Sequence, residues 1–233
     1  MPSDVALLKL SEIFESLQGE GVSTGVPCVF VRLAQCNLHC TWCDTKYTWD
    51  FEHFDYATEV SEVPALEVAA RVNAARARRV VLTGGEPMLQ QRPLSAFFAA
   101  LDSDITVEVE TNGTIAPTAA TLARVAQWNV SPKLSNAGDP EALRLRKNVL
   151  VELRDAGASY LKLVVDGASD CAEAEELVRE LAWPRERVLL MPQASDREEL
   201  RARGETVANA AQTRGFRFSS RLHLELWGGR RGT

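Results

Sequence analysis

The sequence predicts a single α/β domain in which parallel strands form a partial (β/α) barrel. Short apolar runs rich in β-branched residues alternate with stretches of helical periodicity, a pattern typical of βα units around a parallel sheet. The chain has 233 residues, and no internal repeat or Pro-, Gly- or Ser-rich linker divides it. We therefore expect residues 1–233 to form one domain.

Seven segments are expected to be strands because each is short, apolar and bounded by turn residues. They are Val29–Leu33, Val80–Thr83, Ile105–Glu110, Asn129–Ser131, Tyr160–Val165, Val188–Met191 and Leu222–Leu226. Helical patterns lie between them, over Pro64–Ala77, Leu94–Leu101, Pro117–Gln127, Glu141–Arg154, Cys171–Leu181 and Arg197–Thr213. Pro64 and Pro117 suit a first helical turn, where the missing N–H removes no hydrogen bond.

One segment, Asp44–Val63, breaks this regularity because it is aromatic and polar without a clear period. We expect it to be an inserted loop. Polar motifs follow several strands, among them Glu110-Thr111-Asn112-Gly113 and Ser131-Pro132-Lys133. Barrels of parallel strands carry their chemistry at the C-terminal ends of the strands, so these motifs are expected to meet at one site.

Composition and charge exclude several classes of protein. The formal net charge is −6 and no run of Lys and Arg forms a phosphate-binding stripe, so nucleic acid is not expected as a partner. No stretch approaches the roughly 18 apolar residues of a membrane span, and no leader is apparent, so a cytoplasmic protein is expected. Five cysteines are an odd number for a disulfide framework.

Three of the cysteines, Cys36, Cys40 and Cys43, lie on one short loop, separated by three and then two residues. Thiolates are the standard ligands of iron–sulfur clusters. Three thiolates would bind three irons of a [4Fe-4S] cube and leave the fourth open to a non-protein ligand. An open iron implies chemistry and not electron storage alone.

The spacing also suits structural zinc, with His39, Asp44 or a distant cysteine completing a tetrahedral set. The spacing alone leaves both alternatives open. Cys28 lies in an apolar strand and is expected to be a small buried hydrophobe, and Cys171 is expected to be incidental on a helix.

A second motif, Thr83-Gly84-Gly85-Glu86-Pro87, favours the cluster. It follows an apolar strand, where a glycine pair lets backbone approach a ligand closely and a carboxylate can take a cation. The ammonium of an amino acid would fit such a site. Taken alone this motif could be a tight turn, but after a three-cysteine loop the combination is specific.

Together the two motifs resemble the radical S-adenosylmethionine (SAM) superfamily. The resemblance implies that the open iron binds the methionyl amine and carboxylate of SAM. Reduction of the cluster then cleaves SAM to a 5′-deoxyadenosyl radical, which abstracts hydrogen from the substrate. The chain departs from many members at Gln35, which stands where they have Gly before the first cysteine.

The N-terminal stretch Ile13–Gly21, with Thr24-Gly25-Val26-Pro27, Phe30–Leu33 and Trp42–Thr45, closely resembles the 7-carboxy-7-deazaguanine synthase family. The resemblance runs nearly the whole chain. It implies conversion of 6-carboxy-5,6,7,8-tetrahydropterin to 7-carboxy-7-deazaguanine with loss of ammonia, in queuosine and 7-deazapurine biosynthesis.

The substrate side of the site can be read beside that resemblance. Leu17-Gln18-Gly19 offers backbone that a ligand can approach closely and one amide side chain, which suit the donor and acceptor edges of a pterin. Arg32 can bind the substrate carboxylate through two parallel hydrogen bonds, and Thr83 can offer a hydroxyl. Glu110 and Glu20 compete for the proton transfer that loss of ammonia requires. The expected substrate residues are Leu17, Gln18, Gly19, Arg32 and Thr83.

The resemblance also implies the cofactor contacts and partners. SAM is expected at Trp42, Cys43, Asp44, Gly85, Glu86, Ser131, Pro132 and Lys133. Magnesium is expected at the Thr45 hydroxyl, since Mg²⁺ prefers hard oxygen ligands. An electron donor such as flavodoxin or ferredoxin, and a homodimeric state, are expected on the same grounds.

Two rival functions remain from the sequence. A glycyl-radical-enzyme activase shares the cysteine spacing and size, but it has no evident use for Leu17-Gln18-Gly19-Glu20 with Arg32. A non-catalytic zinc or iron–sulfur module has no evident use for Gly84-Gly85-Glu86-Pro87.

Overall fold

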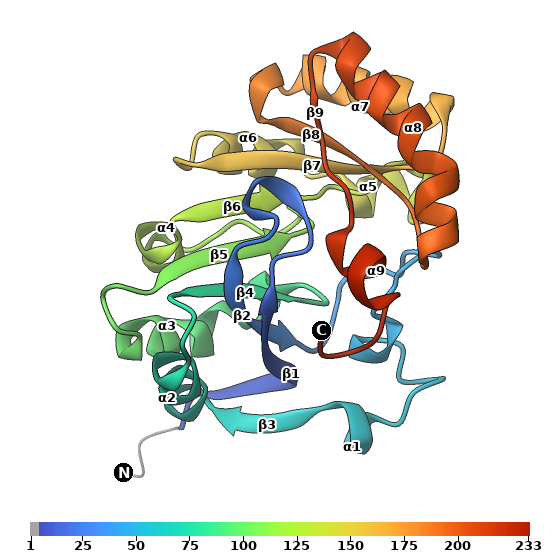
Figure 1. The fold of residues 1–233 in the computed structure, drawn as a ribbon. Coiled ribbons are helices and arrows are strands. Elements are labelled where there is room, and N and C mark those ends of the chain that lie inside the picture. The colour runs from blue at the N-terminus through green and yellow to red at the C-terminus, as the bar shows by residue number, and fades with distance from the viewer. Residues whose placement is uncertain (1–4) are drawn as a thin grey trace.

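A computed structural model of the protein describes residues 5–233, and these contain one sheet of nine strands (Figure 1). Its order is β3-β1-β2-β4-β5-β6-β7-β8-β9, with β1 antiparallel to both neighbours and the strands from β2 to β9 parallel. The two edge strands, β3 and β9, are not paired with each other, so the sheet is open. This confirms the predicted partial barrel. The strands are β1 (Leu7–Leu17), β2 (Pro27–Leu33), β3 (Ser61–Pro64), β4 (Arg79–Gly84), β5 (Thr106–Thr111), β6 (Gln127–Val130), β7 (Ser159–Val165), β8 (Val188–Pro192) and β9 (Arg217–Phe218).

Helices pack on one face of this sheet and enclose the main apolar core with it (Figure 1). Residues from α2, α3, α4, α6, α7 and α8 all contribute to that core, whereas the C-terminal helix α9 lies apart from it. The helices are α1 (Tyr56–Glu59), α2 (Ala65–Ala74), α3 (Gln91–Ala100), α4 (Ala119–Arg124), α5 (Glu141–Arg144), α6 (Lys147–Arg154), α7 (Ala168–Glu180), α8 (Arg197–Arg214) and α9 (Leu222–Trp227).

The alternation of side chains along each strand decides which residues face the helices and which face the other side of the sheet. In β5, Val107 and Val109 belong to the core under the helices, so Glu108 and Glu110 project from the opposite, inner face. In β7 the same rule sends Lys162 to the inner face. The inner face of a largely apolar sheet therefore carries charge.

The tip of the β1–β2 hairpin covers part of this inner face. Ser23 in the tip donates its hydroxyl to Glu108 of β5 at 2.7 Å and accepts from Gln127 of β6 at 3.3 Å. The backbone N–H of Gly21 donates to the hydroxyl of Ser219 at 2.8 Å, just after β9. Residues from both ends of the chain therefore meet inside the open barrel.

The predicted strand Leu222–Leu226 is wrong, because these residues begin helix α9. The Leu-His-Leu-Glu-Leu sequence mimics the two-residue period of a strand, but only Leu224 is buried and Leu226 is half exposed. Gly228, in the left-handed region with φ 66°, ends the helix.

The strand β1 was not predicted, because its alternation changes phase. Leu8 and Leu10 are buried, but the register shifts between Leu10 and Glu12, and Ile13 is the next side chain against the core. The short edge strands β3 and β9 were also missed. The predicted helix Glu141–Arg154 is interrupted between α5 and α6. The other predicted strands and helices are confirmed, but Pro64 ends β3 and Pro117 precedes the N-cap of α4, so neither proline lies in a first helical turn.

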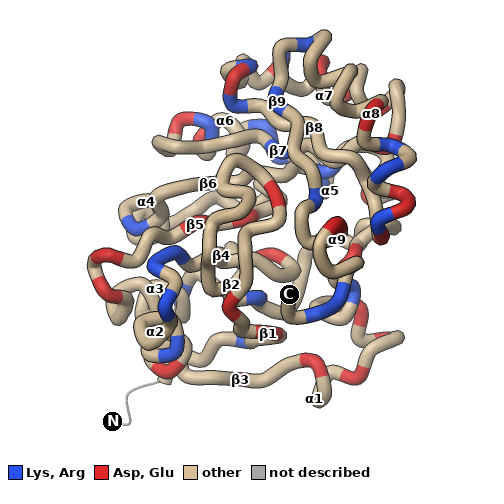
Figure 2. The backbone as a smooth tube through the Cα atoms, viewed as in Figure 1, with Lys and Arg blue, Asp and Glu red and all other residues tan. Residues whose placement is uncertain are grey.

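The segment Asp44–Val63 is mostly irregular, as predicted, but it contains α1 and ends in β3. Charges of both signs are interspersed along the described helices and loops, as Figure 2 shows. None of the helices in residues 5–233 has the length and apolar character needed to span a bilayer.

Candidate active site

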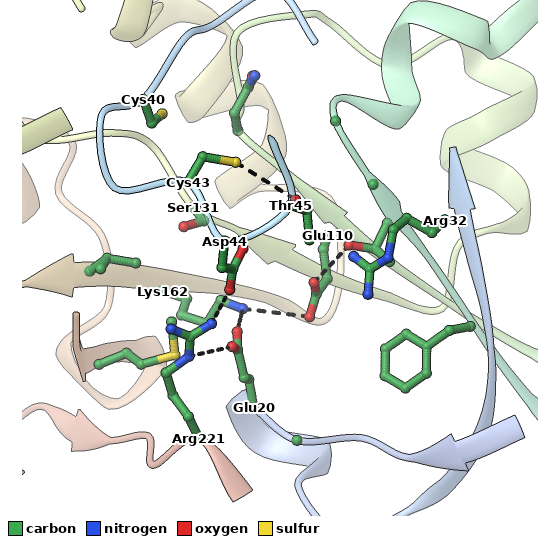
Figure 3. A pocket seen from close by; sticks show the side chains of 18 of the residues that line it. Glu20, Arg32, Cys40, Cys43, Asp44, Thr45, Glu110, Ser131, Lys162 and Arg221 are labelled. Carbon is green, nitrogen blue, oxygen red and sulfur yellow. Dashed lines mark hydrogen bonds and ion pairs between the residues drawn. The ribbon is translucent and has the colours of Figure 1, made fainter. Parts of the chain in front are cut away.

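A cavity lies on the inner face of the barrel, beyond the C-terminal ends of β4 to β7 (Figure 3). The residues predicted for the site line this cavity, with the exceptions of Glu86 and Pro132. Those that line it are Leu17, Gln18, Gly19, Glu20, Arg32, Cys36, Cys40, Trp42, Cys43, Asp44, Thr45, Thr83, Gly85, Glu110, Ser131 and Lys133.

The cysteine loop and the glycine motif are joined by their backbones. The N–H of Gly85 donates to the carbonyl of Leu33 at 3.0 Å, and the N–H of Glu86 donates to that of Gln35 at 2.8 Å. A Cβ on Gly84 or Gly85 would lie 2.0 Å from one of these carbonyl oxygens. The glycines are therefore needed to pack the two loops together, besides bordering the cavity.

Gln35, where the chain departs from many superfamily members, has φ 74°. This left-handed conformation favours glycine, and a residue with a side chain adopts it at a cost of order 1 kcal/mol or more. Hydrogen bonds on both sides of the peptide hold it there, including one from its N–H to the carbonyl of Thr48 at 2.7 Å. The substitution is thus absorbed by the loop without moving a cysteine out of the cavity.

The three thiols suit a cluster with three protein ligands. The N–H of Leu38 donates to Sγ of Cys36 at 3.5 Å, and Nε1 of Trp49 donates to Sγ of Cys43 at 3.3 Å. Such donors stabilise sulfur that carries negative charge. Burial raises the pKa of Cys36 to about 12 and that of Cys40 to about 11, so a bound metal must displace their protons.

The residues that could complete a zinc site point elsewhere. His39 is exposed and stacks on Trp49 with ring centroids 4.8 Å apart, outside the cavity. Asp44 pairs with Arg221. In residues 5–233 no three His, Cys, Asp or Glu side chains converge on one point as ligands of a single ion. A cluster does not require such convergence, because each thiolate binds a different iron.

Glu86 differs from the prediction that its carboxylate takes a ligand's ammonium. Its side chain is fully buried and lies outside the cavity lining. One oxygen accepts from the N–H of Met88 at 2.9 Å and from the hydroxyl of Thr111 at 2.9 Å, and the other accepts from the N–H of Asn112 at 2.7 Å. In this arrangement Glu86 fixes the glycine motif to the end of β5.

Glu20 lies between two cations on one wall of the cavity (Figure 3). Lys162 donates to one of its oxygens and Arg221 to the other, the latter at 3.0 Å, and Arg221 also pairs with Asp44. Burial opposes the ionisation of Glu20, but these two cations outweigh it and hold its pKa well below its usual range. Glu20 is therefore a weak proton acceptor.

Glu110 has looser and mostly neutral partners. The hydroxyl of Thr83 donates to it at 3.0 Å, the amide of Gln18 at 3.3 Å, and the ammonium of Lys162 lies at 3.5 Å. The side chain of Glu110 is 20% exposed, compared with 13% for Glu20. Of the two carboxylates, Glu110 is therefore the more exposed to the cavity and the less tightly paired.

The amide of Gln18 is already engaged inside the protein. Its Nε2 donates to Glu108 at 2.8 Å, and its Oε1 accepts from the N–H of Glu20 at 3.2 Å. Its backbone N–H and carbonyl also bond within the hairpin, to Val26 and Gly25. The donor edge that we predicted for a pterin is therefore not on this side chain, although Gln18 still borders the cavity.

Arg32 points its guanidinium into the cavity towards Glu110 (Figure 3). Its Nε donates to Glu12 at 2.9 Å. Among the described residues, its two terminal nitrogens have no hydrogen-bond partner, although the side chain is only 17% exposed. A nearly buried cation with free donors is matched to an anionic ligand.

Comparison with known proteins agrees with this geometry. The Radical SAM superfamily profile matches residues 31–170. The 7-carboxy-7-deazaguanine synthase of Pyrobaculum aerophilum is 41% identical over 226 residues, which cover 97% of each chain. The chain belongs to the 7-carboxy-7-deazaguanine synthase family. The synthase of Halobacterium salinarum is 37% identical over 96% of this chain and 92% of its own.

Solved structures place the fold in the same group. The crystal structure of QueE from Escherichia coli matches with a TM-score of 0.69 and 28% identity, covering 93% of this chain and 95% of that one. SuiB of Streptococcus suis bound to S-adenosylmethionine matches with a TM-score of 0.54 at 15% identity, over 79% of this chain and 48% of its own, which shows a shared fold. As a radical SAM protein, the chain uses a [4Fe-4S] cluster and SAM.

Sequence reasoning missed the cations that hold the carboxylates in place. Lys162 lies within the apolar run of β7, and a Lys between leucines in a buried strand is a usable signal of a charged partner. Arg221 gave no such signal, because it lies in a polar stretch just before the predicted strand Leu222–Leu226 and not inside an apolar run. Glu12 and Arg231, described below, were also missed.

Proposed function

We propose that this protein converts 6-carboxy-5,6,7,8-tetrahydropterin to 7-carboxy-7-deazaguanine with loss of ammonia. The observation that carries this proposal is one cavity with three thiols on one wall and the free guanidinium nitrogens of Arg32 on another. Similarity to 7-carboxy-7-deazaguanine synthases over 97% of the chain supports it. That similarity favours this activity over a glycyl-radical activase or a non-catalytic module.

The chain's own residues bind and orient the pterin. When bound, the cluster and SAM supply the radical that starts the reaction. Arg32 takes the substrate carboxylate in a fork, and the ring then lies in the cavity that the thiols and Glu110 also line. Thr83 and the backbone around Gly19 border the remaining edges.

Glu110 is the proton carrier in this proposal. Glu20 is held as an anion by Lys162 and Arg221, whereas Glu110 faces the cavity and, among the described residues, forms an ion pair with Lys162 alone, at 3.5 Å. Elimination of ammonia needs a group that gives and takes a proton near the ring, and a positioned carboxylate does this. Glu20 keeps Lys162 and Arg221 in place.

The function is tested by anaerobic incubation of the cluster-loaded protein with reductant, SAM, Mg²⁺ and carboxytetrahydropterin. Mass analysis is expected to find 7-carboxy-7-deazaguanine and ammonia. Cleavage of SAM without conversion of the pterin, under conditions where a 7-carboxy-7-deazaguanine synthase such as that of Pyrobaculum aerophilum forms product, would contradict the proposal.

Arg32→Lys is expected to weaken pterin binding although it keeps the charge. Lysine is a point charge and cannot make the planar fork onto a carboxylate. Loss of a charged hydrogen bond corresponds to about 1.5–3 kcal/mol, or roughly ten- to a hundredfold in affinity. Equilibrium binding of carboxytetrahydropterin measures the change, and an unchanged affinity would remove Arg32 from the substrate site.

Magnesium is proposed at Thr45. Its hydroxyl lies 3.7 Å from Sγ of Cys43 and borders the cavity, so it offers one hard oxygen beside the bound substrate. Mg²⁺ keeps several waters and commonly bridges to a substrate anion, so one protein oxygen is compatible with such a site. Its role would be to fix the pterin and not to form the radical.

Thr45→Ala is expected to raise the Mg²⁺ concentration for half-maximal product formation by at least about tenfold. The cluster spectrum and slow uncoupled SAM cleavage should stay intact, and Thr45→Ser should recover much of the activity because it keeps the hydroxyl. The same half-saturation and maximal rate in Thr45→Ala as in the parent would place the ion elsewhere.

Two partners complete the proposal. An external one-electron donor such as flavodoxin or ferredoxin would reduce the cluster, and the protein would act as a homodimer. Family membership supports both. Reduction assays with each donor and the mass of the native protein in solution test them.

A further inference from the structure

We propose that Glu12 and Arg231 are positioning residues that hold Arg32 in the orientation that recognises the substrate carboxylate. This inference rests on the proposed function, because it assigns residues that act through Arg32 on the same ligand. It concerns a cluster of charges beside the cavity that contains neither a cysteine nor a cofactor residue predicted above.

Glu12 is the centre of this cluster. One of its carboxylate oxygens accepts from Nε of Arg32 and from the hydroxyl of Tyr47, both at 2.9 Å, and the other accepts from Nε of Arg231 at 2.9 Å. The Glu12 side chain is 14% exposed. Burial opposes its ionisation, but Arg32 and Arg231 outweigh it and lower its pKa, so Glu12 remains an anion.

Arg231 is itself held from three directions. Besides Glu12 of β1, its terminal nitrogens donate to the two oxygens of Glu59 at 3.3 and 2.8 Å, at the end of α1. Its guanidinium lies over the ring of Tyr47, 3.7 Å from the centroid. Such a set of contacts fixes a side chain that is otherwise half exposed.

This arrangement decides which edge of the Arg32 guanidinium is available. A guanidinium has five N–H donors, and Glu12 uses the one on Nε. The two terminal nitrogens are left facing the cavity as a pair, which matches the two oxygens of a carboxylate. Without Glu12, Arg32 could turn to pair with Glu110, towards which it points, and the carboxylate site would be lost.

The experiment compares two neighbouring arginines of the same segment. Arg231→Ala removes the contact to Glu12, whereas Arg230→Ala removes an equal charge from an exposed side chain that has no hydrogen-bond or ion-pair partner in the described part of the chain. We expect Arg231→Ala to weaken binding of carboxytetrahydropterin, and to raise its KM, by about tenfold. Arg230→Ala should leave both near the parent value. Arg231→Lys, which keeps the charge but not the fork, should recover part of the loss.

A second ligand, which lacks the carboxylate, distinguishes a role of Arg231 in positioning Arg32 from a general structural effect of the substitution. Tetrahydropterin without the 6-carboxylate should bind the parent and Arg231→Ala with equal affinity, since it makes no use of Arg32. In an Arg32→Ala background, adding Arg231→Ala should change carboxytetrahydropterin binding by less than about twofold, because a residue acting through Arg32 has nothing left to position.

The outcomes are distinct. Equal loss of affinity for both pterins in Arg231→Ala, or no loss for either, would overturn the positioning role while leaving the proposed function intact. A parent protein that binds no carboxytetrahydropterin at all would contradict the proposed function and this inference with it.

Discussion

Replacing any one of Cys36, Cys40 and Cys43 by alanine is expected to abolish both the brown iron–sulfur chromophore and product formation. Each thiolate would bind a different iron, and no other thiol lines the cavity in residues 5–233. A cluster left with two protein ligands has no substitute at the third iron. Visible absorbance, iron content and SAM cleavage of anaerobically reconstituted variants measure the loss.

The remaining cysteines are the matched controls. Cys28 is buried among Phe30 and Val81, and Cys171 is buried in the core on α7. Alanine at either position removes one buried sulfur at a cost of about 1 kcal/mol, and the cluster should remain. A folded Cys28→Ala variant without a cluster would contradict the assignment of three loop ligands.

The second large effect is expected at Glu110. Glu110→Gln keeps a hydrogen-bonding group beside Thr83 but can no longer carry a proton, so product formation should fall by about 10²–10⁴-fold. Uncoupled cleavage of SAM and the thermal midpoint should change little, because the one ion pair of Glu110, to Lys162 at 3.5 Å, is long and Lys162 keeps its closer partner Glu20. Product formation and SAM cleavage measured in the same sample separate the two effects.

Glu20→Gln provides the contrast. It leaves Lys162 and Arg221 buried without their shared anion, and breaking a buried ion pair typically destabilises by about 3–5 kcal/mol. Its main effect should therefore be a lower thermal midpoint. If Glu20→Gln lost product formation at unchanged stability while Glu110→Gln stayed active, the roles proposed for the two carboxylates would have to be exchanged.

Local sequence patterns predicted the fold class, the cysteine loop and the glycine motif, whereas the other cofactor contacts and Thr45 were expected from the family resemblance. The cysteine spacing and the glycine pair are short motifs, and the strands before them are continuous apolar runs. The same local reasoning failed at Leu222–Leu226, where a helix imitates a strand period, and at β1, where a bulge changes the phase.

Interactions between distant residues could not be predicted in this way. Glu86 was expected to face a ligand, yet its three hydrogen bonds join it to β5 and the adjacent turn. Glu12 and Arg221 gain their roles from partners far along the chain, so neither composition nor spacing indicates them. A buried Lys in an apolar strand was the one signal available.

Glu12 and Glu20 lie near the N-terminus, whereas an arginine partner of each is among the last residues to be synthesised. Arg221 lies 201 residues after Glu20, and Arg231 lies 219 residues after Glu12. At about 5–20 residues per second, a ribosome needs roughly 10–40 seconds to make that stretch. Until then, among the described residues, Glu12 has only Arg32, and Glu20 only Lys162, as a cationic partner. Most of the helix-covered core comes from residues that precede both arginines, whereas the substrate side of the barrel is completed only when the residues after the last helix are made.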